Sequence, residues 1–208
     1  MNLHIISDVI DRYFAFMNEL GGNNHLSQFI PAAMIDNSCA LRFEAEGYAC
    51  WKPIKSTITL NDIKFLETKI GYEIPLSYKS FLQHVYYIDL NLGNQPINFF
   101  SLLPDNTIEK LLQEVTSFPP SLIKMKYKPP LARGYIPFGN FSDYGLACFD
   151  TTKNPTIGNE YPLIWLDHED GYQHPQPLAI NFTSIFQEFS VHLDNWIKSK
   201  CEKENTEN

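Results

Sequence analysis

The spacing of hydrophobic residues changes near residue 95, and this change constrains the fold more than any other feature of the chain. Before it, apolar residues recur every three or four positions over 3–20, 60–70 and 78–85, which is typical of helices with one buried face. After it, short runs rich in aromatic residues predict strands at 97–103, 135–141, 144–150, 161–166 and 178–182. We therefore predict an α+β fold, with an antiparallel sheet of about four to six strands flanked by helices and an extra N-terminal helix.

Start and stop signals define a pair of helices in the first half. Thr59-Leu60-Asn61-Asp62 has the form of a capping box, and Gly71 follows the last apolar residue of that helix. Ile74-Pro75 begins the second helix, because proline is tolerated in a first helical turn. Outside this pair, we expect a helix from Asp105 or Asn106 that ends at Pro119-Pro120, and a last one from Asn181 or Thr183.

These elements divide the chain into three parts. Residues 1–50 form an N-terminal helical extension packed on the main domain, 51–200 form the α+β domain, and 201–208 form a polar tail. At 208 residues the chain is long enough to bury a core without help from a metal ion or a disulfide.

Charge narrows the class of partner. The chain has 24 Asp and Glu residues against 16 Lys and Arg, a net charge of −8, so it lacks the basic surface of a nucleic-acid-binding protein. Residues 136–197 carry eight acids and one base, Lys153, whereas 110–133 carry five bases and one acid, Glu114. An acidic face attracts basic proteins, and it also keeps a protein soluble without any partner.

Cysteine usage and hydropathy predict a cytoplasmic protein. Cys39, Cys50, Cys148 and Cys201 form no C-x-x-C pair, and we expect reduced thiols. The N-terminus reaches Asp8 without a basic segment and a long apolar core, which argues against a secretory signal. No apolar run approaches the roughly 20 residues that span a bilayer, so no membrane contact is expected.

The densest polar cluster is the segment from Asp167 to His174, with three carboxylates and two imidazoles. Its two histidines are six residues apart, unlike the i, i+4 pair of a helical zinc site, and Gly171 and Pro175 predict a loop. We interpret it as an exposed loop for interaction rather than a metal site.

The sequence lacks the common motifs of nucleophilic catalysis and of nucleotide binding. The sequence has no G-x-S-x-G, no phosphate-binding loop and no G-x-G-x-x-G, and no cofactor is expected. Asp143 and Asp150 could act as an acid–base pair only if the fold brought them roughly 5 to 10 Å apart. We interpret 142–145 as a turn in which Asp143 bonds the backbone and Gly145 has a positive φ. The three tryptophans, Trp51, Trp165 and Trp196, are expected in the core.

The order of these segments resembles the SUKH superfamily of Smi/Knr-type domains. Leu66-Glu67-Thr68-Lys69-Ile70-Gly71 and Ile74-Pro75-Leu76-Ser77-Tyr78-Lys79-Ser80-Phe81-Leu82 are similar to its signature E-x-x-[LI]-G-x-x-[LI]-P-x-x-[YF]-K-x-[FL]-[LY]. Segments of the second half are similar to that family's strand, turn and strand. The residues that match the family as structural positions are Trp51, Glu67, Gly71, Pro75, Tyr78, Phe81, Pro137, Gly145, Asp150 and Trp165.

The resemblance implies an α+β binding domain without catalysis. Many bacterial members are immunity proteins that neutralise polymorphic or contact-dependent toxins, and fungal relatives act in cell-wall assembly and signalling. We therefore expect a cognate toxin domain as partner, with a basic nuclease as one candidate class. From charge and loop position alone, we expect the contact at Asp143, Tyr144, Asp167, His168, Glu169 and Asp170.

Two other interpretations stay open. The first is a regulatory or scaffolding module that binds a partner of the same cell, as the fungal relatives suggest. The second is a metal-dependent hydrolase that uses the 167–174 loop, in which His168 and His174 would be essential.

Overall fold

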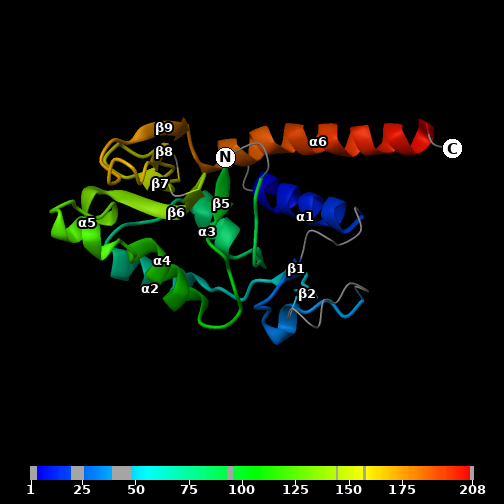
Figure 1. Ribbon diagram of the computed structural model, residues 1–208, viewed down its shortest axis with the longest axis horizontal. Helices are drawn as coiled ribbons and strands as arrows, with labels where there is room; N and C mark the ends of the chain where they lie inside the picture. Colours follow the sequence, from blue (N-terminus) through cyan, green and yellow to red (C-terminus); the bar gives the residue numbers. More distant parts are fainter. Residues whose placement is uncertain are drawn as a thin grey trace.

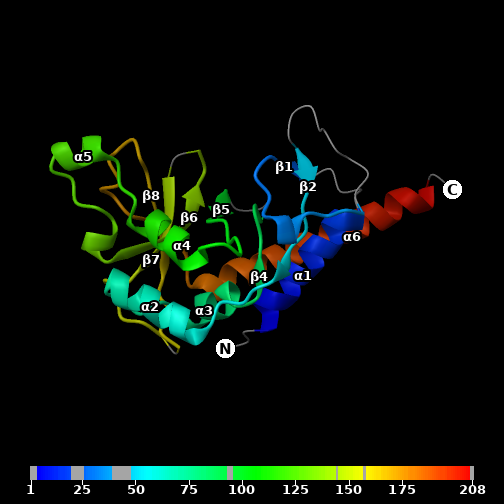
Figure 2. The same cartoon turned by 90° about the horizontal axis from the view of Figure 1, so that it is seen from below.

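The computed structural model describes residues 4–19, 26–38, 48–92, 96–143, 145–156 and 158–206. Figures 1 and 2 show a sheet with helices around it and a long C-terminal helix that runs past one end. The helices are α1 (His4–Glu19), α2 (Leu60–Ile70), α3 (Leu76–Leu82), α4 (Thr107–Thr116), α5 (Pro120–Lys124) and α6 (Phe182–Thr206), with short 3₁₀ turns at Ala32–Met34 and Leu131–Arg133.

The main sheet has five antiparallel strands in the order of the chain. They are β5 (Ile97–Phe99), β6 (Tyr135–Phe141), β7 (Gly145–Asp150), β8 (Leu163–Leu166) and β9 (Gln176–Ala179). Two smaller antiparallel pairs join β1 (Leu26–Ser27) to β2 (Ala49–Cys50), and β3 (Ile54–Lys55) to β4 (Val85–Tyr86). The predicted fold class, α+β with an antiparallel sheet and an additional N-terminal helix, is confirmed.

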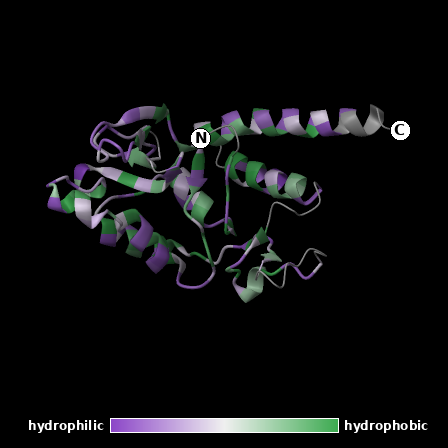
Figure 3. Cartoon of the chain, in the orientation of Figure 1, coloured by the Kyte–Doolittle hydropathy of each residue, from purple (hydrophilic) through white to green (hydrophobic). Residues whose placement is uncertain are grey.

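The core is a cluster of aromatic rings between the sheet and the helices α3 and α6. The Phe182 ring, in the first turn of α6, lies 5.2 Å from the Tyr78 ring of α3 and 5.5 Å from the Phe138 ring of β6. Edge-to-face and tilted contacts of this kind add to the free energy gained by burying the rings. Figure 3 shows hydrophobic and hydrophilic residues alternating along α6, as expected of a helix with one buried face.

α2 has both of the ends that the sequence predicts, whereas α3 ends at Leu82, earlier than predicted, because Val85 lies in β4. The Thr59 hydroxyl accepts from the Asp62 N–H, and the Asp62 carboxylate accepts from the Thr59 N–H, so the capping box is complete. Gly71 ends α2 in the left-handed region at φ 79°. The Glu67 carboxylate then accepts the Ile74 N–H and pairs with Lys79 Nζ at 2.7 Å, which fixes α3 against α2.

α1 packs along α6. Arg12 forms an ion pair with Asp194 and donates to the Ser190 hydroxyl, and the Tyr13 ring contacts the Phe189 ring. His84 Nε2 lies 2.7 Å from Asp11 Oδ1 and joins α1 to the turn after α3. Burial raises the pKa of Tyr13 to about 12, with Asp89 adding to the rise.

Several expectations from sequence are wrong in detail. Trp196 is 38% exposed, because α6 extends beyond the core that covers its first turns. Pro119-Pro120 ends α4 but also begins α5, since proline is compatible with a first helical position. The last strand is Gln176–Ala179, earlier than 178–182, because the Asn181 side chain accepts from the Ser184 N–H and caps α6.

The cysteines also differ from expectation. Cys50 is disulfide-bonded, so the prediction of reduced thiols is wrong for it. Cys148 is free and buried, and this burial raises the pKa of its thiol well above the ordinary value. A search of the described helices finds none with the length and hydrophobicity to cross a membrane.

A candidate partner-binding site at one end of the sheet

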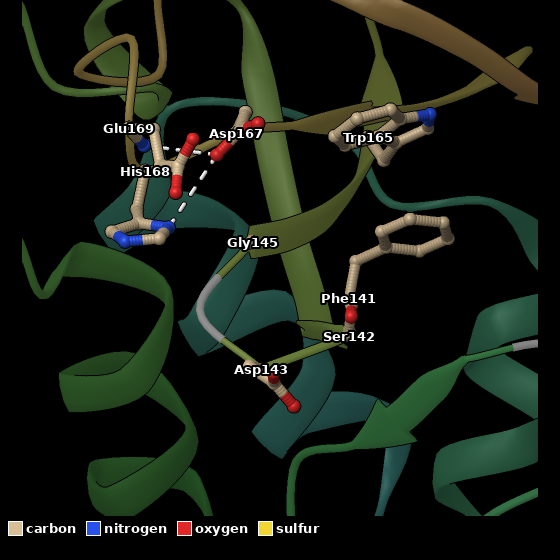
Figure 4. Close-up of a pocket in the computed structure, with 8 residues that line it drawn as sticks. All are labelled: Phe141, Ser142, Asp143, Gly145, Trp165, Asp167, His168 and Glu169. Atoms are coloured by element: carbon tan, nitrogen blue, oxygen red, sulfur yellow. Dashed lines mark hydrogen bonds and ion pairs between the residues drawn. The ribbon is translucent and has the colours of Figure 1, made fainter.

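Sheet register brings two distant acidic segments together. Phe141 pairs with Gly145 across the β6–β7 hairpin, and Leu146 pairs with Leu166 across β7 and β8. The turn that contains Asp143 and the loop that begins at Asp167 therefore leave the sheet at the same end. Both line one open cavity of about 450 Å³ (Figure 4), which has eight lining residues: Phe141, Ser142, Asp143, Gly145, Trp165, Asp167, His168 and Glu169.

Four of the six residues expected from sequence to contact a partner line this cavity. They are Asp143, Asp167, His168 and Glu169. Asp170 belongs to the same loop but is not among the lining residues, and Tyr144 lies outside the residues that the structure describes. Whether any of these residues binds a partner stays a prediction.

Hydrogen bonds within the 167–174 loop set the direction of two of its carboxylates, those of Asp167 and Asp170. Asp167 Oδ1 accepts the Glu169 N–H and lies 3.4 Å from His168 Nδ1. The Asp170 carboxylate accepts N–H groups of Gln173 and His174, and its Oδ2 lies 2.9 Å from His174 Nδ1. Burial raises the pKa of Asp170, but these hydrogen bonds outweigh it, and the pKa lies below its ordinary value. Asp170 therefore helps to hold the loop together, and its expected contact with a partner stays a prediction.

Contacts from other elements hold the loop as a whole. Arg133 donates to the carbonyl oxygens of Tyr172 and Gln173, and its guanidinium lies 4.9 Å from the centre of the Tyr135 ring. Gly171 has φ 69°, and a Cβ at this position would lie 2.7 Å from the Tyr127 ring. Glycine is required there for both reasons, and the loop consequently packs directly on the segment that follows α5.

One wall of the cavity is aromatic. The rings of Phe141 and Trp165 are stacked, with centroids 4.9 Å apart and planes at 16°. Figure 4 shows them on one side of Gly145, with Asp167, His168 and Glu169 on the other. The sequence did not indicate Phe141 as a candidate site residue. Trp165 was expected in the core, but in the structure it is only half-buried and lines the cavity. The sequence feature that could have indicated Trp165 as a site residue is its position near the end of a strand, just before the acidic loop.

Gly145 has a different role from the one predicted. Its φ lies outside the left-handed region, and among the described residues of the turn Ser142 has a positive φ, of 53°. A Cβ on Gly145 would lie 2.8 Å from the Phe141 carbonyl oxygen and 2.9 Å from that of Leu166. Glycine is needed because three strands approach closely here, not because of turn conformation.

The cavity suits a positively charged group from a partner. The Asp143 and Glu169 side chains are exposed, and in the described part of the chain no base forms an ion pair with either. An aromatic wall beside free carboxylates attracts lysine and arginine side chains through both cation–π and ionic contacts. No group of three or more His, Cys, Asp or Glu side chains that could hold a metal ion occurs among the described residues.

The residues that match the family signature lie mainly in buried structural positions away from the cavity. Trp51, Tyr78 and Phe81 are buried in the main core. Asp150, at the end of β7, is buried and accepts the Thr152 N–H, which shapes the turn after the strand. Gly145 and Trp165 belong to both sets, since they also line the cavity.

The sequence gives no indication of a structural role for Glu160. In the structure its side chain is buried, with only 2% exposed. Its carboxylate accepts both the Ser77 N–H, at 3.0 Å, and the Ser77 hydroxyl, at 2.7 Å. A carboxylate at this position compensates the free N–H groups and the positive end of α3. No local pattern indicates this contact, because the two residues are 83 positions apart.

Comparison with protein families shows which family the chain matches. The model of the SMI1 / KNR4 family (SUKH-1) matches residues 57–188, which contain the α2–α3 pair, the five-stranded sheet and the cavity. No curated protein matches the chain.

Proposed function

Because the chain belongs to the SMI1/KNR4 (SUKH-1) family, we propose that it is a non-catalytic, cytoplasmic protein-binding domain that neutralises a cognate toxin. The toxin would be bound through the acidic cavity at the end of the sheet. The observation that carries this proposal is the convergence of Asp143, Asp167 and Glu169, from two separate loops, on one open cavity with an aromatic wall.

The charge distribution supports a basic partner. Asp143 and Glu169 project from loops rather than into the core, and Asp167 also lines the cavity. A toxin that cleaves nucleic acid has a positively charged substrate site, and carboxylates can occupy that site in place of phosphates. Electrostatic attraction would make association fast and sensitive to ionic strength.

Rigid support of the loop also favours binding over catalysis. Arg133, Gly171 and the Asp170 hydrogen bonds hold the loop in one conformation, so little conformational entropy is lost when a partner binds. A preorganised loop of this kind needs no cofactor to act, and we propose none.

The test has two steps: a search of the neighbouring genes for one that encodes a toxin, and then co-expression of this chain with the toxin domain found there. Cells that express the toxin domain should survive when the wild-type chain is present. They should lose this protection, in whole or in part, with the double variant Asp143→Asn/Glu169→Gln. The purified pair should associate more slowly with the variant, with a smaller dependence on salt.

A matched control is Asp105→Asn/Glu188→Gln, which removes the same charge from two exposed positions outside the cavity lining. Equal protection by the wild type and the cavity variant would contradict the proposed site. Absence of any protection would favour a regulatory module that binds a partner of the same cell. A metal-dependent activity lost in His168→Ala and His174→Ala would favour the hydrolase alternative.

A further inference from the structure

A basic and apolar projection lies next to the acidic cavity. It consists of α5 and the turn after it, and we name residues 121–128 the α5 tip. Ile123 is 54% exposed and Met125 is 61% exposed, and Lys124, Lys126 and Lys128 are exposed between and after them. Figure 3 shows hydrophobic and hydrophilic residues side by side on α5. Large apolar side chains in such a position often indicate an interaction site.

The lysines of the α5 tip are available to another molecule. In the described residues, no carboxylate forms an ion pair with any of the three, although the chain is strongly acidic overall. The base of the tip is firmly held, because Phe118 and Leu122 pack on the cluster around Cys148 and the Phe118 ring contacts the Tyr172 ring at 5.9 Å. The tip is therefore a fixed feature of the surface.

The α5 tip and the acidic loop of the cavity adjoin each other on one surface. Gly171 of the acidic loop packs against the Tyr127 ring at the end of the tip. Figure 2 shows α5 and the ends of β6 and β8 on the same side of the molecule. The tip is positive and apolar, and the adjoining loop is negative and borders the cavity, whose far wall is aromatic.

Such a surface is complementary to itself. When two copies meet around a two-fold axis, each positive half faces the negative half of the other copy, as an isologous interface requires. Lysines of the tip would then meet Asp143 and Glu169, and Met125 would meet the ring pair of Phe141 and Trp165, a contact that thioether sulfur favours. The positive charge of the tip is thus matched by the carboxylates of the cavity, and its apolar side chains are matched by the aromatic wall.

We infer that this chain forms a salt-sensitive, two-fold symmetric dimer in which the α5 tip of each copy occupies the acidic cavity of the other. The same carboxylates carry the proposed toxin contact, so the dimer and the toxin complex exclude each other. The inference concerns the chain alone and does not depend on the proposed function, since its test contains no toxin.

Sedimentation velocity of the purified full chain tests the dimer. At roughly 100 µM protein and about 50 mM NaCl the wild type should be dimeric, and its dissociation constant should rise about tenfold or more by about 0.5 M NaCl, because salt screens the ion pairs. The tip variant Lys124→Glu/Lys126→Glu/Lys128→Glu should be monomeric, and so should the cavity variant Asp143→Lys/Glu169→Lys. An equimolar mixture of the two variants should form a heterodimer, because both contacts are then between opposite charges.

The control variant Lys64→Glu/Lys153→Glu/Lys198→Glu changes the net charge equally at exposed positions on α2, the turn after β7 and α6. It should remain dimeric. A monomeric wild type at low salt would overturn the inference. It would also be overturned if the wild type stayed monomeric and instead bound vesicles of anionic phospholipid through the α5 tip. Dimerisation that survives in either reversed variant, or that fails to return in their mixture, would overturn it as well.

Discussion

The α2–α3 pair and the acidic cavity use carboxylates in opposite ways. In the helix pair, Glu67 and Glu160 accept hydrogen bonds from α3 or from the residue that leads into it, and Glu67 also pairs with Lys79. In the cavity, Asp143 and Glu169 point outward and no described base forms an ion pair with them. The difference shows that acidic residues of one chain can serve the fold in one region while remaining available to a partner in another.

The largest effect on stability is expected from Glu160→Ala. This change leaves the buried Ser77 N–H and hydroxyl without an acceptor, and it should lower the free energy of unfolding by about 2 to 3 kcal/mol. Urea denaturation measures the loss, with Glu160→Gln as the variant that keeps an acceptor. If Glu160→Ala cost no more than a surface substitution, the proposed role of Glu160 at α3 would be wrong.

A loss of about 1 to 3 kcal/mol is expected from Gly145→Ala, because the new Cβ would lie under 3.0 Å from two carbonyl oxygens and force the strands apart. Gly71→Ala is the matched control. A Cβ at position 71 would meet no atom within 4 Å, so this variant has only the strain of a positive φ at a non-glycine residue, about 1 kcal/mol. Thermal unfolding of both variants distinguishes steric crowding from backbone strain, and equal losses would contradict this distinction.

A smaller effect, dependent on pH, is expected at the capping box. Hydrogen bonds from the Thr59 N–H and hydroxyl lower the pKa of Asp62 below its ordinary value of 3.8. A carboxyl group whose pKa is lower in the folded state stabilises the protein fully above its unfolded pKa, and this stabilisation is lost as pH falls through the folded value. The melting temperature of the wild type should therefore approach that of Asp62→Ala as pH falls below 3.8, whereas at neutral pH the wild type should be more stable.

The smallest effect on stability is expected in the cavity. Asp143→Asn and Glu169→Gln should each change the free energy of unfolding by less than about 0.5 kcal/mol, because both side chains are exposed and unpaired with any described base. A loss above 1 kcal/mol in urea would mean that these residues serve the fold, and the contrast with Glu160 would disappear.

Local patterns predicted the helix pair well and the region after α4 poorly. The α2–α3 pair depends on contacts between residues close in sequence, such as the Thr59–Asp62 capping box. After α4, Pro119-Pro120 was interpreted only as a stop signal, and α5 was missed. Proline is compatible with both the end of one helix and the start of the next, so the local pattern could not decide between them.

For the candidate site, the sequence indicated which residues are acidic and lie in loops, but not which of them share a cavity. Asp170 and Glu169 are neighbours with the same charge, yet Asp170 accepts the Gln173 and His174 N–H groups while Glu169 faces the cavity. The roles of two adjacent carboxylates differ because the loop conformation depends on Arg133 and on the packing of Gly171 against Tyr127.

The sequence by itself determined the α+β class, the limits of α2, the start of α3 and the acidic character of the turn and the loop. These properties depend on the spacing of apolar residues and on hydrogen bonds between groups a few residues apart. Only the tertiary structure decided that Asp143 lies with Asp167 and Glu169, and that Glu160 caps α3 from 83 positions away. Contacts of this kind depend on strand register and on the packing of elements distant in sequence, which no local pattern specifies.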